Sequence, residues 1–413
     1  MRKVVITGIG AVTPLGNDIN STWDNIISQR SGISLITRFD AAALKSRIAG
    51  ELKDFVPGNY MPAKDILRLD PFVQYAAAAA LMACENAGLS VGANGRSPMP
   101  GSAAVIIGSS RGGITSMEKA LENYLLKGKP FSAYLMSAST INMAAAYISM
   151  NSGIKGPSLG ISTACASGTN AIGEAFRMIQ HGDIDIALAG GAEAPVCRLS
   201  VGGYGASGAL SIRNTGPDKA SRPFDRDRDG FVVAEGACVL VLEALDHAIK
   251  RDAVIYAELA GYVTTSDAFH QTKPESGGEA DAMTKALKDA DVRFEEVDYI
   301  NAHATSTLLG DTAEARAIRQ VFGDRSADIH ISCCKSMLGH MLGAAGALEA
   351  AITALSIQRG IITPTINLEN QDPSFGLNIA TSVISEDINI AISNSFGFGG
   401  VNAVLVLRKF NQK

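Results

Sequence analysis

Residues 158–168 read Ser-Leu-Gly-Ile-Ser-Thr-Ala-Cys-Ala-Ser-Gly, a short apolar run followed by a turn of small residues that carries Cys165. A helical pattern follows over residues 166–179. Residues 329–340 read Ile-His-Ile-Ser-Cys-Cys-Lys-Ser-Met-Leu-Gly-His, and a second helical pattern opens there and continues through Gln358. A strand, a tight turn with reactive side chains and a helix therefore occur twice, which predicts a molecule of two related halves.

Strand and helix patterns also alternate along the rest of the chain. Short apolar runs typical of strands buried on both faces occupy residues 4–7, 103–108 and 186–191, and helical patterns occupy residues 21–29, 72–87 and 114–126. This alternation predicts an α/β fold with closely packed halves.

A short connecting helix is predicted over residues 242–250, and we place the division between the halves at its end. The N-terminal half then spans residues 1–250 and the C-terminal half spans residues 251–413. Residues 192–232 have no clear period and are predicted to form a long irregular loop, a kind of segment that is usually functional.

Composition and charge exclude several classes of protein. The chain has 413 residues, 46% of them hydrophobic, so a large buried core is expected. Its 36 basic and 41 acidic side chains give a net charge of −5, which argues against binding to nucleic acid or to an anionic membrane surface. The longest apolar stretch, residues 75–84, is about half of what a bilayer needs, and the first residues do not read as a signal peptide. A cytoplasmic protein with mostly reduced cysteines is therefore expected.

Cys165 has the sequence context of a nucleophile. It follows an apolar strand and precedes a helix, as nucleophiles on strand-to-helix turns do. The positive end of the helix dipole is expected to lower the pKa of this thiol from about 8.5 into the range of roughly 3.5 to 7.5. The alternative is a buried packing cysteine, which is the interpretation that we keep for the other five cysteines.

Two histidines follow predicted strands. His303 stands in Tyr-Ile-Asn-Ala-His-Ala-Thr-Ser-Thr and His340 in Lys-Ser-Met-Leu-Gly-His. Because catalytic groups gather at the carboxyl ends of strands in α/β sheets, Cys165 and both histidines are predicted to converge. A single histidine is more often structural, but two of them in such turns favour a functional role.

Residues 394–402, Asn-Ser-Phe-Gly-Phe-Gly-Gly-Val-Asn, alternate aromatic residues with glycine. Such a loop lets the backbone approach a ligand closely while a ring such as that of Phe396 packs over it. The alternative is a glycine-rich hairpin without a ligand. The chain has no phosphate-binding loop, dinucleotide fingerprint or zinc-protease motif, so neither a nucleotide nor a metal is indicated.

Together these motifs resemble the β-ketoacyl-acyl carrier protein synthases, the condensing enzymes of fatty acid synthesis, and above all their type II branch. The resemblance extends from residues 4–8, Val-Val-Ile-Thr-Gly, to residues 396–400, Phe-Gly-Phe-Gly-Gly. It implies the duplicated thiolase fold, with five layers in the order α-β-α-β-α, and a homodimer. The implied duplication agrees with the repeat in the sequence.

The resemblance implies a decarboxylative Claisen condensation of malonyl-acyl carrier protein with a cysteine-bound acyl group, giving β-ketoacyl-acyl carrier protein in fatty acid chain elongation. Cys165 is the implied nucleophile, and the backbone N–H groups of Cys165 and Phe398 are implied to hold the oxyanion. His303 and His340 are implied to bind the thioester carbonyl of the malonyl group and to stabilise the enolate. No metal, nucleotide or other cofactor is implied.

Further residues carry roles by the same resemblance. Lys335, paired with Glu349, is implied to orient the site, and the alternative for this pair is a purely structural ion pair. Thr305, Thr307 and, more weakly, Thr272 are implied to contact the pantetheine arm of the carrier protein.

Arg111 departs from the family, which usually has a small or apolar residue there, near the dimer interface and the end of the acyl tunnel. A guanidinium at this place needs a paired acceptor, or else it shortens the tunnel or favours an acyl group with a polar end. The acyl chain length is therefore left open.

Acyl carrier proteins are acidic, so a synthase of net negative charge needs basic side chains around its tunnel mouth. Lys64 and Arg68 match family positions of this kind, and Lys127 and Lys129 lie near another. The alternative for each is ordinary solvated surface charge.

Two other functions stay open. A thiolase would need a second cysteine near the C-terminus, which residues 394–402 lack, and His340 argues against a type III synthase. A specialised type II polyketide-like ketosynthase remains, because Arg111 sets this chain apart. A catalytically silent thiolase-fold partner of acyl carrier protein is the alternative from another class.

Overall fold

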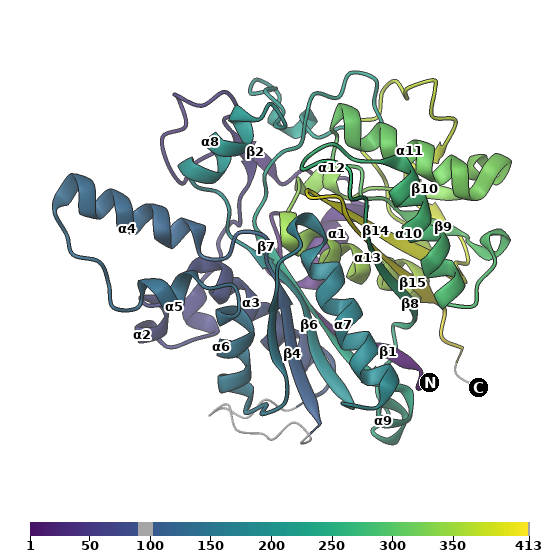
Figure 1. Ribbon diagram of the computed structural model, residues 1–413, viewed down its shortest axis with the longest axis horizontal. Coiled ribbons are helices and arrows are strands. Elements are labelled where there is room, and N and C mark those ends of the chain that lie inside the picture. The colour runs from purple at the N-terminus through teal and green to yellow at the C-terminus, as the bar shows by residue number, and fades with distance from the viewer. Residues whose placement is uncertain (90–101, 412–413) are drawn as a thin grey trace.

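The computed structural model describes residues 1–89 and 102–411, and within them the main feature is one mixed sheet of eleven strands (Figure 1). From edge to edge the strands follow the order β12-β10-β9-β14-β15-β8-β1-β7-β6-β4-β5. Their bounds are β1 (Val4–Val12), β4 (Ala103–Gly108), β5 (Ser158–Ile161), β6 (Ile186–Glu193), β7 (Gly236–Ala244), β8 (Ala257–Ser266), β9 (Tyr299–Asn301), β10 (His330–Ser332), β12 (Asn378–Ile379), β14 (Ile390–Gly397) and β15 (Val401–Arg408).

Five strands of each half have the same arrangement. In the first half β4 is parallel to β5 and β6, and β7 is antiparallel to β6 and β1. In the second half β9 is parallel to β10 and β14, and β15 is antiparallel to β14 and β8. The two sets join where β1 pairs with β8. The shared order confirms the predicted duplication, while the division of the chain at residue 250 stays a prediction.

Helices complete the five layers. α3 and α6 pack on the outer face of the first strand set, α10 and α11 cover the outer face of the second, and α7 and α13 lie between the two sets (Figure 1). The helices are α1 (Ile19–Ile27), α2 (Ala63–Ile66), α3 (Pro71–Asn86), α4 (Ile114–Lys127), α5 (Leu135–Ser139), α6 (Met143–Ser152), α7 (Ser167–His181), α8 (Arg198–Ala206), α9 (Leu245–Lys250), α10 (Ser276–Asp289), α11 (Leu308–Phe322), α12 (Lys335–Leu338) and α13 (Ala345–Arg359). Two small sheets pair β2 (Ile33–Leu35) with β3 (Ile48–Gly50) and β11 (Ile361–Ile362) with β13 (Ile384–Ser385). None of the described helices is long and apolar enough to cross a membrane.

The two central helices approach each other through small residues at their N-terminal ends. A Cβ on Gly168 would lie 2.7 Å from the carbonyl oxygen of Gly343, and a Cβ on Gly346 would lie 1.9 Å from Oγ1 of Thr169. Glycine is therefore required at both places. This contact brings the N-terminal ends of α7 and α13 together, and the candidate site residues lie beside those ends.

The described elements correct two predictions. Residues 242–244 belong to strand β7 and pair with β1, so the predicted helix over residues 242–250 begins only at Leu245. Glu243 in this strand is fully buried and bonded to Thr7, His247 and Arg251. A charged residue is unusual in a buried strand, so the apolar strand pattern could not be recognised there. The region 192–232 also contains helix α8, whose three glycines weaken its helical pattern.

Candidate active site

Cys165 lies on a tight turn between β5 and α7. A single 3₁₀ turn over Ala164–Ala166 carries it, and Ala164 has a left-handed φ of 50°. Oγ of Ser167 accepts a hydrogen bond from the backbone N–H of Thr163 at 2.9 Å and donates one to the carbonyl of Ala164 at 2.6 Å. Left-handed backbone at a non-glycine residue persists where the surroundings enforce it, as these bonds do. The turn therefore holds the sulfur at the head of α7.

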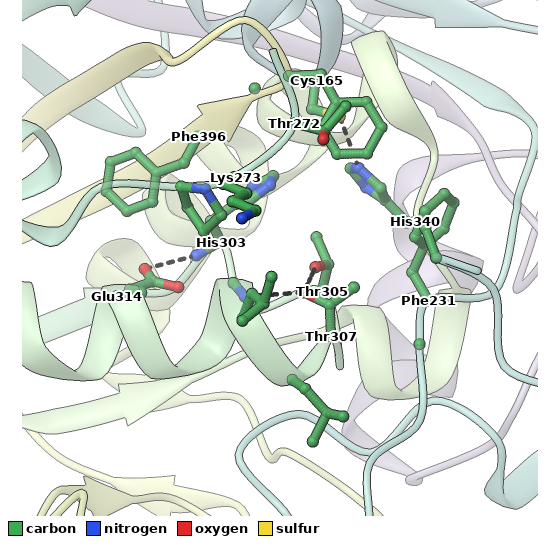
Figure 2. A pocket seen from close by; sticks show the side chains of 18 of the residues that line it. Cys165, Phe231, Thr272, Lys273, His303, Thr305, Thr307, Glu314, His340 and Phe396 are labelled. Atoms are coloured by element: carbon green, nitrogen blue, oxygen red, sulfur yellow. Dashed lines mark hydrogen bonds between the residues drawn. The ribbon is translucent and has the colours of Figure 1, made fainter. Parts of the chain in front are cut away.

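Both histidines face this sulfur, although they come from the other half of the chain. Nε2 of His340 lies 3.0 Å from Sγ of Cys165, and the His303 and His340 rings meet edge to face with centroids 5.3 Å apart. One donor atom from each of the three residues lies within 4.8 Å of the others. Figure 2 shows the three side chains around one cavity. The predicted convergence is confirmed.

The backbone fixes the position of each imidazole. His303 follows β9, and its N–H and that of Ala304 donate to the Glu314 carboxylate at 2.9 and 2.6 Å. The N–H of His340 donates to the carbonyl of Val232 at 2.7 Å. Both rings are thus placed by main-chain bonds before a substrate arrives, which is the preorganisation that catalysis requires.

Lys335 forms the predicted ion pair with Glu349, and both side chains are 2% exposed. Burial opposes the charge on the ammonium, but the Glu349 carboxylate outweighs burial and raises the pKa of Lys335. Lys335 is therefore a fixed positive charge within the site.

The predicted low pKa of the nucleophile is wrong. Burial raises the pKa of Cys165 to about 12, and Lys335 and the backbone N–H of Phe398 lower it only in part. Loss of solvation raises the pKa of the thiol more than the positive end of the helix lowers it, because few groups in an apolar wall can replace the water around a thiolate. The resting sulfur is a neutral thiol beside an imidazole.

Both imidazoles are neutral as well. Burial lowers the pKa of His303 and of His340 well below the usual value, and the charge on Lys335 lowers both further. In a neutral imidazole one ring nitrogen accepts a hydrogen bond and the other carries the proton and donates one. The site therefore offers two uncharged donor-acceptor groups.

The cavity around these residues has a volume of about 430 Å³ and two unlike ends. One end is apolar and is lined by Tyr204, Phe231 and Leu342, which belong to one hydrophobic cluster with Cys165. The other end is polar. It is lined by the predicted residues Thr272, Thr305, Thr307 and Phe396, together with Lys273, Glu279 and Glu314.

The loop between β14 and β15 lies against the nucleophile turn. The backbone N–H of Phe398 lies close enough to the sulfur of Cys165 to lower the pKa of this thiol. A Cβ on Gly397 would lie 3.2 Å from the backbone nitrogen of Cys165, so only glycine keeps this space open. The loop that carries Phe398 therefore lies next to the backbone of Cys165, and the oxyanion role of their N–H groups stays a prediction.

Arg111 does not line the cavity. Its Nε donates to the hydroxyl of Tyr204 at 2.8 Å, and its guanidinium lies 5.1 Å from the centre of that ring. The guanidinium thus has the acceptor that the sequence analysis required. Tyr204 stands between Arg111 and the cavity, so any effect of Arg111 on an acyl group passes through this ring.

The four basic residues assigned to carrier-protein binding lie on the surface, away from the cavity lining. Lys64 lies in α2, and Arg68 follows it with its guanidinium 4.5 Å from the ring of Tyr134. Lys127 ends α4, and Lys129 follows it. All four are exposed, and their role stays a prediction.

Sequence analysis missed Glu314, Tyr204 and Phe231. Glu314 and Asp311 lie three residues apart on the face of α11 that also buries Ala315 and is otherwise apolar. Acidic residues on an otherwise apolar face of a helix are often buried at a functional site. The sequence alone could therefore have indicated Glu314. Tyr204 and Phe231 lie in the region without a clear period and gave no signal.

Cys165, His303 and His340 also form a possible metal-binding group, since thiolate and imidazole are ligands that zinc prefers. A metal bound there would occupy the sulfur and both imidazoles.

Profiles of known families match most of the chain. The profile described as "Beta-ketoacyl synthase, N-terminal domain" matches residues 1–248, and the profile described as "Beta-ketoacyl synthase, C-terminal domain" matches residues 256–369. The chain belongs to the β-ketoacyl synthase family. Its predicted family membership and its duplicated thiolase fold are confirmed.

Similar β-ketoacyl synthases cover the whole chain. Proteins named 3-oxoacyl-[acyl-carrier-protein] synthase 2 from Coxiella burnetii and Vibrio cholerae are 45% and 42% identical to it, over 99% of each chain. Among solved structures, the ishigamide ketosynthase/chain length factor has a TM-score of 0.92 at 37% identity, covering 99% of this chain and 100% of that one. A β-ketoacyl synthase from Burkholderia phymatum has a TM-score of 0.92 at 35% identity, with full coverage of both chains.

Proposed function

We propose that this protein is a 3-oxoacyl-acyl carrier protein synthase that condenses malonyl-acyl carrier protein with a Cys165-bound acyl group in fatty acid chain elongation. The proposal rests on one observation, the thiol of Cys165 and the imidazoles of His303 and His340 gathered within 4.8 Å in one cavity. Relatives at 42–45% identity carry the name of this activity.

In the first step Sγ of Cys165 attacks the thioester carbonyl of an acyl-acyl carrier protein. The thiol proton passes through Nε2 of His340, 3.0 Å away, to the leaving sulfur of the carrier, while the acyl carbon forms its bond to Cys165. The backbone N–H groups of Cys165 and Phe398 stabilise the negative oxygen, a contribution worth about 10²- to 10³-fold per donor.

In the second step His303 and His340 donate hydrogen bonds to the thioester carbonyl of the malonyl group. The bond to the carboxylate breaks, carbon dioxide leaves, and its electron pair forms the enolate that these donors and the charge of Lys335 stabilise. The enolate carbon attacks the carbonyl carbon of the Cys165 thioester, the sulfur leaves as a thiolate that carries the negative charge, and a proton from solvent restores the thiol. His340 serves in both steps because a neutral imidazole can carry its proton on either nitrogen.

The two ends of the cavity suit the two substrates. The apolar end at Tyr204 and Phe231 suits an acyl chain, and Arg111 limits its length by fixing the Tyr204 ring. The polar end at Thr305 and Thr307, whose hydroxyls lie 3.1 Å apart, suits the amides of a pantetheine arm. Thr272 lies at the same end, and we assign it the same role.

We propose that the protein works as a homodimer through strand β5 and helix α4. β5 is an edge strand with three exposed residues, and α4 has no buried residue in the single chain. Large apolar side chains of α4, among them Met117, Leu121 and Leu125, are about half to two-thirds exposed. An unpaired strand edge and an apolar helix face are both surfaces that a second copy of the chain could cover.

The partner protein is acyl carrier protein in its acyl and malonyl forms. One structural relative, 34% identical with a TM-score of 0.90, is a type II polyketide ketosynthase in complex with its acyl carrier protein. We assign this contact to Lys64, Arg68, Lys127 and Lys129, whose positive charge suits an acidic carrier. The six free cysteines support a reducing, cytoplasmic location.

Labelling of the nucleophile tests the proposal. Incubation with an acyl-acyl carrier protein or with cerulenin, followed by peptide mapping, should place the adduct on Cys165 ahead of the other five cysteines. Addition of malonyl-acyl carrier protein should then release β-ketoacyl product and carbon dioxide. Absence of any acyl-enzyme would favour the catalytically silent partner of acyl carrier protein. A product formed only from specialised acyl groups would favour the polyketide-like ketosynthase. The contact between Arg111 and Tyr204 is the observation that keeps this second alternative open.

A further inference from the structure

Glu279 lies in the first turn of α10 and lines the polar end of the cavity. The residue is only 1% exposed, and its Oε2 has no hydrogen-bond partner among the described residues. A buried polar atom without a partner is costly unless something completes it. The steps proposed above give this carboxyl group no role.

The surroundings of Glu279 place it on the malonyl side of the site. Ala280, next to it on α10, packs in one cluster with Phe396, whose ring centre lies 6.0 Å from that of His303. Figure 2 shows Phe396 and Glu314 beyond His303, on the side away from Cys165. Glu279 lines the same cavity and has Glu314 as a neighbouring charge, so we assign it to this part of the wall.

The surroundings of Glu279 favour its neutral, protonated form. Burial raises the pKa of Glu279 well above its usual value, and the carboxylates of Glu314, Asp267, Glu275 and Asp311 raise it further. Glu314 takes three N–H donors, from His303, Ala304 and Asn394, as an ionised acceptor does. Burial raises the pKa of Glu314 too, but these three donors oppose that shift, whereas Oε2 of Glu279 has no donor among the described residues. Of the two carboxyl groups, Glu279 is therefore the one whose surroundings favour a free hydroxyl.

The malonyl carboxylate needs a place on this side. With the thioester carbonyl held by His303 and His340 and the enolate carbon facing Cys165, a carboxylate that leaves from the face opposite to the attacking one points away from the sulfur. We propose that the unpartnered carboxyl group of Glu279 donates a hydrogen bond to the carboxylate of the malonyl unit and so selects it. This inference rests on the proposed condensing function.

Such a bond belongs to substrate binding. It forms with the ground-state carboxylate and is lost as carbon dioxide leaves, and no proton is transferred. Its removal should therefore raise the KM for malonyl-acyl carrier protein without lowering kcat. A hydrogen bond to a charged group corresponds to about a tenfold change or more.

The test compares Glu279→Leu with Glu279→Gln, which keeps a neutral donor. The KM for malonyl-acyl carrier protein should rise about tenfold in the leucine variant and stay near the wild-type value in the glutamine variant. The KM for the acyl-acyl carrier protein and the rate of Cys165 acylation should not change in either. Asp281→Asn is the matched control, since Asp281 lies on the same helix but is exposed and bonded to Lys285.

A pH profile gives an independent reading should the leucine variant fold poorly. In the wild type, ionisation of Glu279 at high pH replaces a donor with a charge that repels the malonyl carboxylate, so the KM should rise there. The glutamine variant should stay flat over the same range, although Glu314, Asp267, Glu275 and Asp311 are unchanged.

Opposite results separate the two proposals. An unchanged malonyl KM in Glu279→Leu, or equal pH profiles for wild type and Glu279→Gln, overturns the role of Glu279 while the enzyme still condenses. A wild-type protein that forms no acyl-Cys165 and no β-ketoacyl product overturns the condensing function itself.

Discussion

The two strand–turn–helix units of the molecule share a scaffold and differ in what the turn contains. In the first half β5 leads through one 3₁₀ turn into α7 and presents Cys165. In the second half β10 leads into α12, with Lys335 at its start, and then past His340 into α13. Both units bring their central helix to the same meeting point.

The difference shows how a duplicated fold becomes a catalyst. The topology of the sheet fixes where each turn lies, and the length of the turn decides which reactive side chains it can carry. The short turn leaves room for a single reactive atom, whereas the longer one places a buried cation and an imidazole. Neither half alone holds Cys165 together with the two histidines that face it.

Replacement of Cys165 gives the largest expected effect and tests the contribution of the first half alone. Cys165→Ala should lower condensation by about 10⁴-fold or more, because no acyl-enzyme can form. Cys165→Gln should still release carbon dioxide from malonyl-acyl carrier protein, since His303 and His340 remain and the amide occupies the place of the acyl thioester. A glutamine variant without carbon dioxide release would contradict the roles of the histidines.

Replacement of one member of the buried ion pair tests the scaffold of the second half. Lys335→Met leaves Glu349 buried without its partner, and we expect a loss of about 3–5 kcal/mol in the free energy of unfolding. Denaturant titration measures it. The double variant Lys335→Met/Glu349→Leu should recover most of the stability. If the double variant also recovers full activity, the pair is purely structural.

The histidines test whether the second half acts on the malonyl group. His303→Ala should slow carbon dioxide release by about 10²- to 10³-fold, because one donor to the forming enolate is lost. Acylation of Cys165 should change little, since His340 is the residue bonded to the sulfur. Equal losses in both half-reactions would show that the two halves do not divide the work in this way.

The pH dependence of thiol modification tests the environment of the first turn. Because burial raises the pKa of Cys165 to about 12, the thiolate fraction increases about tenfold per pH unit below that value. Alkylation of Cys165 by iodoacetamide should therefore speed up about 100-fold between pH 7 and pH 9. An alkylation rate that levels off near pH 7 would mean that the pKa of Cys165 is low, and that the helix end lowers this pKa more than desolvation raises it.

Arg111 gives the smallest expected change and concerns only the acyl end. Arg111→Ile frees the ring of Tyr204 and should shift the kcat/KM ratio toward longer acyl groups by about tenfold in a panel of acyl-acyl carrier proteins. Tyr204→Phe is the control that keeps the ring and removes the hydroxyl. Unchanged selectivity in both variants would remove Arg111 from the determinants of chain length.

Much of this arrangement follows from the sequence because it depends on local patterns. The apolar run at residues 103–108 is strand β4 as predicted, and the turns that carry Cys165 and His303 follow strands in the expected way. His340 differs, because helix α12 separates it from the end of β10. Their convergence follows from a general property of α/β sheets, for which pattern and topology suffice.

Electrostatics and long-range contacts escape such reasoning. The pKa of Cys165 depends on how completely the folded chain excludes water from the sulfur, which no local pattern reveals. The bond between Arg111 and Tyr204 joins residues 93 positions apart. Glu279 reads as one more charge on an exposed helix, and only packing shows that it is buried.

The ends of the eleven-stranded sheet limit how the molecule assembles. At one end the two-residue strand β12 covers β10, while at the other end β5 lies open. β5 has four residues and β12 has two, so β5 offers the longer of the two outer edges. In the homodimer that we propose, two copies paired symmetrically through β5 would cover both of these edges and leave only the two-residue strands β12 at the ends of the joined sheet, which would limit further growth.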